Sequence, residues 1–254
     1  MARLPRLYVP QIPQLVQAEF AYPLAAVNDP TPADQLDQIL QWLQRDAREH
    51  KLALHAWLLL NDRITLLATP DDPQSIARLV QSLGRRIAAS MRHGRVFTGR
   101  YRSALVEPAQ WVLPAMVWLE SLPVQHHYVD RPERWPWSSA GEHAGLLASL
   151  HRPASTTASG HAAGLMPSQS LLTDHPDYWQ DGNTPFARQA SYRERLARGL
   201  GSSQRQRIEQ ALFGQWVLGE KGFLARMAAQ TTRRIAPAPR GRPRKVAAPD
   251  QATD

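Results

Sequence analysis

The chain has 254 residues, 43% of them hydrophobic, which is enough to bury a substantial core and to carry an extension. Its 30 lysines and arginines exceed its 22 acidic residues, which favours polyanions such as nucleic acid as partners, although a merely basic protein has the same balance. The lack of cysteine excludes disulfides, cysteine-based zinc sites and a thiol nucleophile. No apolar stretch approaches the roughly 20 residues that cross a bilayer, and prolines interrupt the amino-terminal segment, so we expect a cytoplasmic protein.

Residues 1–150 alternate between the periodicities of strands and helices. This order predicts an α+β fold of the ferredoxin-like type, with a four-stranded antiparallel sheet and helices on one face. The expected elements are a strand at 15–20, a helix starting at 32, strands at 52–60 and 63–68, a helix at 73–92, a strand at 101–106 and a helix at 109–122.

Threonine and proline positions set the expected helix boundaries. Thr31 is expected to cap the first helix, with Pro32 at the first helical position. The third helix should end before Pro123, because a residue that precedes proline avoids the helical region. Pro114 should make that helix kink or begin late.

The composition changes after residue 150, where the main domain of residues 1–150 should end. Residues 151–170 are small, polar and aperiodic, as in a linker. Residues 171–232 are expected to form a helical extension with breaks at 199–202 and 214–222. Residues 233–254 lack hydrophobic periodicity, which predicts a flexible basic tail.

Four segments resemble, in the right order, the motifs of one protein family. WLLLNDRITLLATP at 57–70 resembles YVLMPNHVHLLLTP, GRVFTGRYRSALV at 94–106 resembles GTLWEGRYRSSLV, WLESLPV at 118–124 resembles YIELNPV, and RWPWSS at 134–139 resembles YPWSS. These are motifs of the tyrosine transposases associated with repetitive extragenic palindromes (REP), which are HUH-class enzymes acting on single-stranded DNA. LLTDHPDYW, RQASYR, QWVLGEKGF and RGRPRK resemble the long form of that family.

The resemblance implies a metal-dependent transesterification whose residues are replaced here. In the family, two histidines hold Mg²⁺ or Mn²⁺, a tyrosine on the third helix attacks the phosphate, and an asparagine four residues later helps to hold the metal. The matching positions are Arg63, Thr65, Trp118 and Leu122. An arginine repels a divalent cation and an indole has no nucleophilic oxygen. The resemblance therefore implies a degenerate member without a catalytic residue, bound metal or other cofactor.

Other residues could in principle stand in for those that are lost. His126, His127 and Tyr128 cluster just past Pro123, but they lie outside the expected helix and should form an exposed loop that points away from the pocket. The other candidates have structural explanations, namely a hydrogen-bonded, half-buried strand position for His55, an Asn-Asp turn for Asp62 and core positions in the extension for Tyr178 and Tyr192.

A stretch with seven arginines and no acidic residue runs from 73 to 106. Each phosphate contact made by such arginines adds salt-dependent affinity, and the rings of Phe97 and Tyr101 could stack on unpaired bases. Arg63 is expected to clamp a phosphate that the family's metal would hold. The alternative is a solvated arginine face on an amphipathic helix. The expected nucleic-acid contacts in this part of the chain are Arg63, Arg78, Arg85, Arg86, Arg92, Arg95, Arg100, Tyr101 and Arg102.

The segment PRGRPRK at 239–245 contains the R-G-R-P core of an AT-hook-like minor-groove binder, and a plain basic tail is the alternative. Its contacts would be Arg240, Arg242, Arg244 and Lys245.

Together these features predict a transposase-like protein that binds single-stranded or hairpin DNA without cleaving it, with a related active transposase as a further partner and no membrane. The alternatives are an active transposase or endonuclease with substitute residues, a relic without a specific ligand, and an RNA-binding protein.

Overall fold

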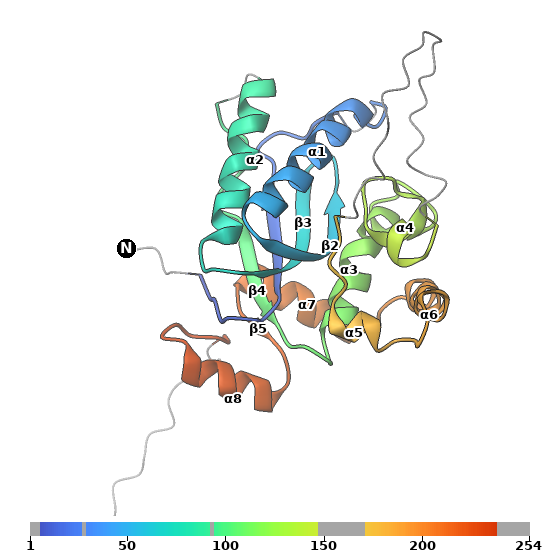
Figure 1. Cartoon of the computed structure of the whole chain (residues 1–254). Coiled ribbons are helices and arrows are strands. Elements are labelled where there is room, and N and C mark those ends of the chain that lie inside the picture. The colour runs from blue at the N-terminus through green and yellow to red at the C-terminus, as the bar shows by residue number, and fades with distance from the viewer. Residues whose placement is uncertain (1–5, 27–28, 92–93, 147–170, 238–254) are drawn as a thin grey trace, which may run out of the picture.

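A computed structural model of the protein, shown in Figure 1, describes residues 6–26, 29–91, 94–146 and 171–237. Within these ranges, five strands form one sheet in the order β2-β3-β1-β4-β5. The strands are β1 (Gln14–Glu19), β2 (Leu52–Leu59), β3 (Arg63–Pro70), β4 (Arg102–Val106) and β5 (Val217–Leu218). The helices are α1 (Ala33–Glu49), α2 (Ser75–Met91), α3 (Val112–Gln125), α4 (Ala140–His143), α5 (Pro176–Trp179), α6 (Pro185–Arg198), α7 (Ser202–Gly214) and α8 (Lys221–Gln230), with the 3-10 turn η1 at Pro132–Arg134.

The ferredoxin-like core follows the order expected from the sequence. Elements β1, α1, β2, β3, α2 and β4 succeed one another, and β1, β2, β3 and β4 pair with one another only in antiparallel fashion. The apolar residues at helical spacing explain how the helices pack, since Leu36 and Leu43 of α1 and Leu79 and Leu83 of α2 are buried. The α+β class is therefore confirmed.

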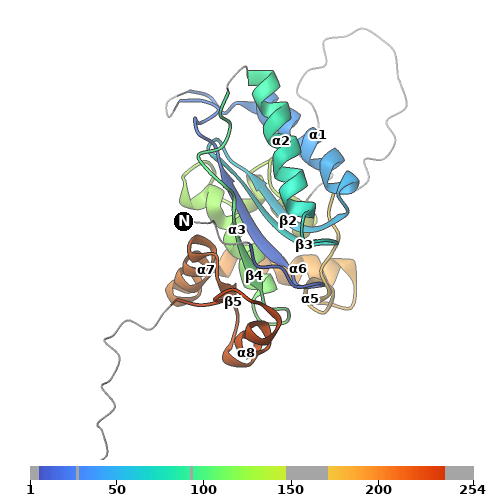
Figure 2. The same ribbon diagram turned by 90° about the vertical axis from the view of Figure 1, so that its left-hand side faces the viewer.

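The expected four-stranded antiparallel sheet with helices on one face is wrong in two respects. Strand β5 adds a fifth strand that runs parallel to β4, so the sheet is mixed. Figure 2 shows α1 and α2 on one side of the sheet and α3 and α7 on the other. The reason lies in α3, of whose 14 residues nine are buried. A helix that is apolar around most of its circumference has to be covered on more than one side.

The prediction that α3 ends before Pro123 is wrong, because the helix continues through this proline to Gln125. Proline removes one backbone bond near the carboxyl end of the helix, but the N–H of His126 still reaches the carbonyl of Leu122 at 2.9 Å. Pro114 lies in the first turn, where the missing N–H would have no helical partner. In agreement with the expected late start, α3 begins at Val112.

The predicted cap of α1 is also wrong by one residue. The helix begins at Ala33, Pro32 occupies the capping position, and the side chain of Thr31 makes no capping hydrogen bond. The carbonyl of Pro32 accepts the N–H of Leu36 at 3.0 Å, which closes the first turn. This is the ordinary first backbone bond of the helix, and it does not replace the side-chain cap that we expected from the threonine hydroxyl.

Residues 171–237 pack directly on the core. Strand β5 pairs with β4, α7 contacts β4 and β1, and both α6 and α7 contact α3. The breaks between α6 and α7 and between α7 and α8 fall where the glycines predicted them. The expected linker at 151–170 lies outside the described residues, as does the chain from 238 onward. Within the described ranges, no helix is long and apolar enough to span a membrane.

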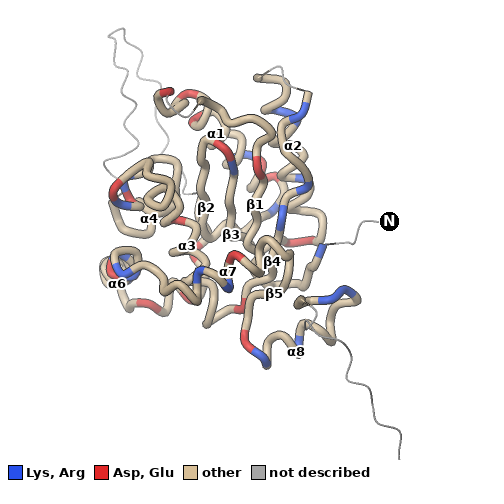
Figure 3. Tube along the Cα trace, turned by 180° about the vertical axis from the view of Figure 1, so that it is seen from behind, with Lys and Arg blue, Asp and Glu red and all other residues tan. Residues whose placement is uncertain are grey.

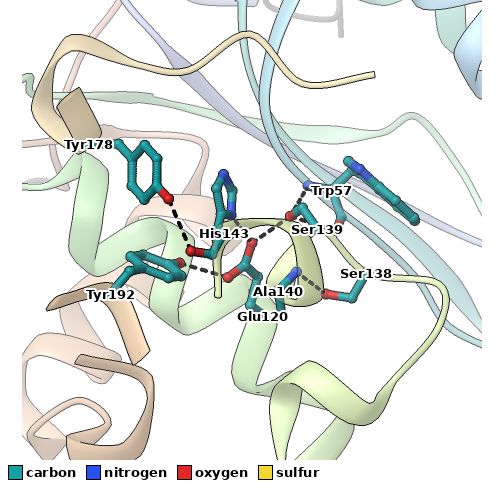
Figure 4. A network of polar contacts seen from close by, with 8 residues as sticks. All are labelled: Trp57, Glu120, Ser138, Ser139, Ala140, His143, Tyr178 and Tyr192. Carbon is teal, nitrogen blue, oxygen red and sulfur yellow. Dashed lines mark hydrogen bonds and ion pairs between the residues drawn. The ribbon is translucent and has the colours of Figure 1, made fainter. Parts of the chain in front are cut away.

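A buried polar network around Glu120 of α3 joins the core to the extension, as Figure 4 shows. One carboxylate oxygen lies 2.6 Å from Nδ1 of His143 and accepts the hydroxyl of Ser139 at 2.5 Å, while the other accepts the hydroxyl of Tyr192 at 2.7 Å. Burial alone would lower the pKa of His143, but the charge and hydrogen bond of Glu120 outweigh it and raise this pKa. The carboxylate is thus compensated from three directions, two in the core and one in α6.

His55 of β2 forms a second polar link to the extension. It is fully buried, not half-buried as expected, and both ring nitrogens are satisfied. Nδ1 lies 2.7 Å from the carbonyl oxygen of Thr173, and Nε2 lies 2.8 Å from the hydroxyl of Thr69. Burial lowers the pKa of His55 from 6.5 to about 4. His55 is therefore neutral in the folded protein near neutral pH.

We expect the free energy of unfolding to fall as the pH is lowered from about 6.5 to about 4. In this range the unfolded chain binds a proton at His55 that the folded chain excludes, so acid favours unfolding. A difference of one in pKa is worth about 1.4 kcal/mol, which limits the loss from this residue to roughly 3 kcal/mol. Urea denaturation at several pH values should give a shallower pH dependence for His55→Gln than for the wild type, and parallel curves would refute the assignment.

Candidate nucleic-acid interface

A groove of about 800 Å³ lies between α2 and residues 94–101, which lead into β4. Four arginines line this groove and no acidic residue does. Arg85 comes from α2, Arg95 and Arg100 from the connection to β4, and Arg6 from the amino-terminal segment. Figure 3 shows the basic residues recurring along α2 and the chain beside it. The groove is therefore a surface of one charge sign, which suits a polyanion.

Tyr101 lies beneath Arg6 and is buried, so its ring does not offer a free face for a base. The guanidinium carbon of Arg6 is 3.3 Å from the ring centroid, and Nη2 donates to the carbonyl of Tyr101 at 3.0 Å. Burial, with Arg100 and Arg233 nearby, lowers the pKa of Arg6. Tyr101 therefore positions Arg6 in the groove. Arg6 could not be predicted as a groove residue from the sequence, because the arginines before the first strand form no periodic pattern.

Phe97 is a half-buried aromatic residue of the groove. Its ring stacks on Phe20 with centroids 5.8 Å apart and an interplanar angle of 13°. Gly84 of α2 makes room for it, since a Cβ atom there would be 3.1 Å from Cε2 of Phe97. Glycine inside a helix costs roughly 0.5–1 kcal/mol relative to alanine, and this close packing accounts for its place in α2. Phe97 lines the groove and so remains the candidate for contact with a base.

Arg85 and Arg100 are the arginines best placed to meet a ligand. Both are exposed, and neither is within salt-bridge distance of a carboxylate in the part of the chain that the structure describes. Arg95 is exposed too, but it donates to the carbonyls of Phe97 and Thr98 and so braces the connection to β4. A phosphate in the groove would find at least two unpaired guanidinium groups.

Three other arginines that we expected to contact DNA are held in ion pairs. Their DNA contacts stay predictions, and the pairing gives each of them a structural role as well. Arg78 pairs with Asp72 at 3.0 Å, Arg86 with the fully buried Asp46 at 3.4 Å, and Arg102 with Glu19 at 3.0 Å. The other expected contacts, Arg92, Arg240, Arg242, Arg244 and Lys245, lie outside the described residues.

The four positions that match the family's catalytic residues lie on β3 and α3, which pack against each other. Arg63 and Thr65 share one face of β3 because side chains alternate along a strand. Thr65 is fully buried, and its hydroxyl makes no hydrogen bond among the described residues. Trp118 and Leu122 lie one turn apart on α3 and are buried, with Nε1 of Trp118 donating to Glu209 of α7 at 3.4 Å.

Arg63 is engaged by its neighbour in the chain, Asp62. Nε and Nη2 of Arg63 donate to the two carboxylate oxygens at 2.9 and 2.5 Å, and this pair raises the pKa of Arg63. Burial and then the charge of Arg63 lower the pKa of His126, while burial and then Asp62 raise that of Tyr128. These two residues are exposed, as expected, and they lie close enough to Arg63 and Asp62 for the charges of that pair to affect their pKa.

We expect Asp62→Ala to raise the affinity for DNA, because it releases the Arg63 guanidinium for a phosphate. One added phosphate contact is worth a factor on the order of five to ten at moderate salt. Arg63→Ala should instead lower affinity by a factor of the same order, because it leaves the Asp62 carboxylate uncompensated beside the phosphate. Anisotropy titrations with a DNA hairpin measure the affinity of both variants. Glu49→Ala, which removes an exposed acid, is the control with the same change in charge as Asp62→Ala. Equal gains in the Asp62 and Glu49 variants would mean that only net charge matters.

Comparison with known proteins gives similarity to solved structures alone. No family model matches the sequence, and no curated protein matches it. A REP-associated tyrosine transposase bound to a REP hairpin is similar over 68% of this chain and 100% of that chain, with 12% identity and a TM-score of 0.49. A candidate transposase from Deinococcus radiodurans R1 is similar over 50% of this chain and 95% of that chain, with 17% identity and a TM-score of 0.33.

The motifs at 57–70, 94–106 and 118–124 resemble those of the tyrosine transposases. Both similar structures carry a transposase name, and one of the two is called a tyrosine transposase. Identities of 12% and 17% compare folds alone, and at these TM-scores the likeness decides neither activity nor ligand. The function of this chain therefore has to follow from its own residues, above all from those of the groove.

Proposed function

We propose that this protein is a transposase-like DNA-binding protein that binds single-stranded or hairpin DNA and does not cleave it. The groove between α2 and residues 94–101 carries the proposal, because it combines four arginines with no acidic residue. Arg85 and Arg100 supply charge for phosphates, and Phe97 supplies an aromatic edge for a base. The motif resemblance to REP-associated enzymes makes a hairpin the first ligand to test.

The proposed loss of cleavage is supported by the residues at the family's catalytic positions, which do not fit Mg²⁺ or Mn²⁺. These cations take oxygen-rich ligand sets, whereas Arg63 brings a positive charge and Leu122 brings only carbon. The hydroxyl of Thr65 is the single oxygen among the four side chains. Within the described ranges, no three histidine, aspartate or glutamate side chains gather into a metal site.

The test is a titration of the protein into labelled hairpin, unpaired and duplex DNA of equal length at two salt concentrations, with anisotropy as the readout. We expect the hairpin or the unpaired strand to bind more tightly than the duplex, with affinity that falls steeply as salt rises. An RNA hairpin of the same sequence decides between the two polymers. Weak binding with equal affinity for the three DNA ligands and the RNA hairpin would identify a relic with no specific ligand and overturn the proposal.

The enzymatic alternative is a nuclease that uses substitute residues, and Tyr128 is its best nucleophile. Tyr128 is exposed, and Arg63, which could bind a phosphate, lies within electrostatic reach. Against this role, burial and Asp62 raise the pKa of Tyr128, which makes the phenol a weaker nucleophile. Incubation with end-labelled hairpin DNA should give no nicked product and no covalent adduct. Nicking that disappears in Tyr128→Phe would establish the alternative.

A further inference from the structure

A second cavity, of about 600 Å³, lies between α3, the loop around η1, and the extension helices α6 and α7. It is lined by residues of α3, whereas the basic groove is lined by residues of α2, and these two helices lie on opposite faces of the sheet (Figure 2). The cavity exists only because the extension packs on the core, since both contribute to its walls. Its volume falls within the range typical of small-ligand sites.

The inner wall of this cavity is apolar. Val117 and Trp118 of α3 face Leu196 of α6 and Leu200 of the connection to α7. The hydrogen bond from Trp118 to Glu209 fixes the plane of the indole. Val117, Trp118 and Leu196 are buried behind this wall. Its accessible apolar surface therefore comes from the half-buried Val124 and Leu200, against which a flat group such as a nucleobase would replace water.

The rim of the cavity is basic. Arg131, Arg193 and Arg205 line it, all three are exposed, and none pairs with a carboxylate among the residues described. Two acidic residues also line it, but Asp130 is neutralised by Arg134 at 2.8 Å, which leaves Glu133 against three arginines. The positive end of α7, which begins two residues after Leu200, adds to the same potential.

We infer that this cavity binds one unpaired nucleotide of a nucleic-acid strand. The base would lie against the apolar wall, and the flanking phosphates would meet the arginines of the rim. The hydroxyl of Ser121, buried without a hydrogen bond in the described structure, and the amide of Gln125 would pair with the edge of the base. The inference rests on the proposed function in that the nucleotide belongs to a bound strand, and it gives the extension a role in recognition.

Three hairpins with the same stem test the inference: one blunt, one with an unpaired extension of three nucleotides, and one with the same extension lacking its bases. We expect the extended hairpin to bind about tenfold more tightly than the other two, with extensions tried at each end. Arg193→Ala/Arg205→Ala should remove this advantage and leave binding of the blunt hairpin within twofold. Arg45→Ala/Arg198→Ala, which removes two exposed arginines that do not line the cavity, is the matched control.

Two results would overturn the inference. One is equal binding of the normal and the baseless extension, which would mean that no base enters the cavity. The other is a uniform loss of affinity for all three hairpins in the double variant, which would mean that the rim arginines act as general charge. If none of the hairpins binds, the proposed function is wrong. Binding of free nucleotides then tests the cavity on its own. Deoxynucleoside monophosphates should then bind to the wild type and not to the Arg193→Ala/Arg205→Ala variant.

Discussion

Arg85→Ala/Arg100→Ala should weaken hairpin binding on the order of 10- to 100-fold, because it removes two phosphate contacts from the groove. The slope of log affinity against log salt should fall by about two, since each lost contact releases about one counterion fewer. Both side chains are exposed and lie without a carboxylate partner in the described structure, so we expect the fold to be unaffected. Anisotropy titrations over a salt series measure both quantities.

The matched control is Arg45→Ala/Arg198→Ala, which removes the same charge from exposed positions on α1 and α6 outside the groove. This variant should keep the wild-type salt slope to within a few tenths and lose less than threefold in affinity. If both double variants weaken binding equally, net charge attracts the DNA and the groove has no special part in binding.

Glu120→Ala should lower the free energy of unfolding by about 3–5 kcal/mol, which is a large share of the stability of an ordinary domain. The carboxylate is fully buried and serves His143, Ser139 and Tyr192 at once, so its removal leaves three buried groups without their partner. Urea denaturation followed by fluorescence measures the change, and limited proteolysis tests whether the extension loosens first.

Two variants calibrate this result. Tyr192→Phe removes one hydrogen bond from the network and should cost about 1–2 kcal/mol, whereas Glu194→Ala on the exposed face of α6 should stay within about 0.5 kcal/mol. A loss below 1 kcal/mol in Glu120→Ala would show that the network contributes little and that apolar packing alone holds the extension.

The ferredoxin-like core could be predicted because its signals are local. Alternating residues in β1 to β4 and the apolar faces of α1 and α2 each specify an element without knowledge of the others. Strand β5 could not be predicted, since two residues show no period and are strands only because β4 lies beside them. The end of α3 was also mispredicted because of non-local contacts. The burial of the residues around Pro123 outweighs the local tendency of a helix to end before proline.

The sequence predicted which segment forms the basic groove, but it did not predict which arginines of that segment are available to a ligand. The acid-free arginine stretch marked the groove, but sequence could not tell Arg85, which is free for a ligand, from Arg86 one residue later, which turns toward Asp46 of α1. Glu120 carried a signal that we overlooked. A single acid inside the apolar run of α3 indicates a buried, compensated carboxylate.

The parallel pairing of β5 with β4 also affects the chain while it is being synthesised. The β4 edge of the sheet is made by residues 102–106, but the strand that covers it is synthesised more than 110 residues later. Until then, the growing polypeptide presents open N–H and C=O groups that can recruit a strand from another molecule. Chains cut short before residue 217 should therefore self-associate on the ribosome or in refolding, where the complete chain does not.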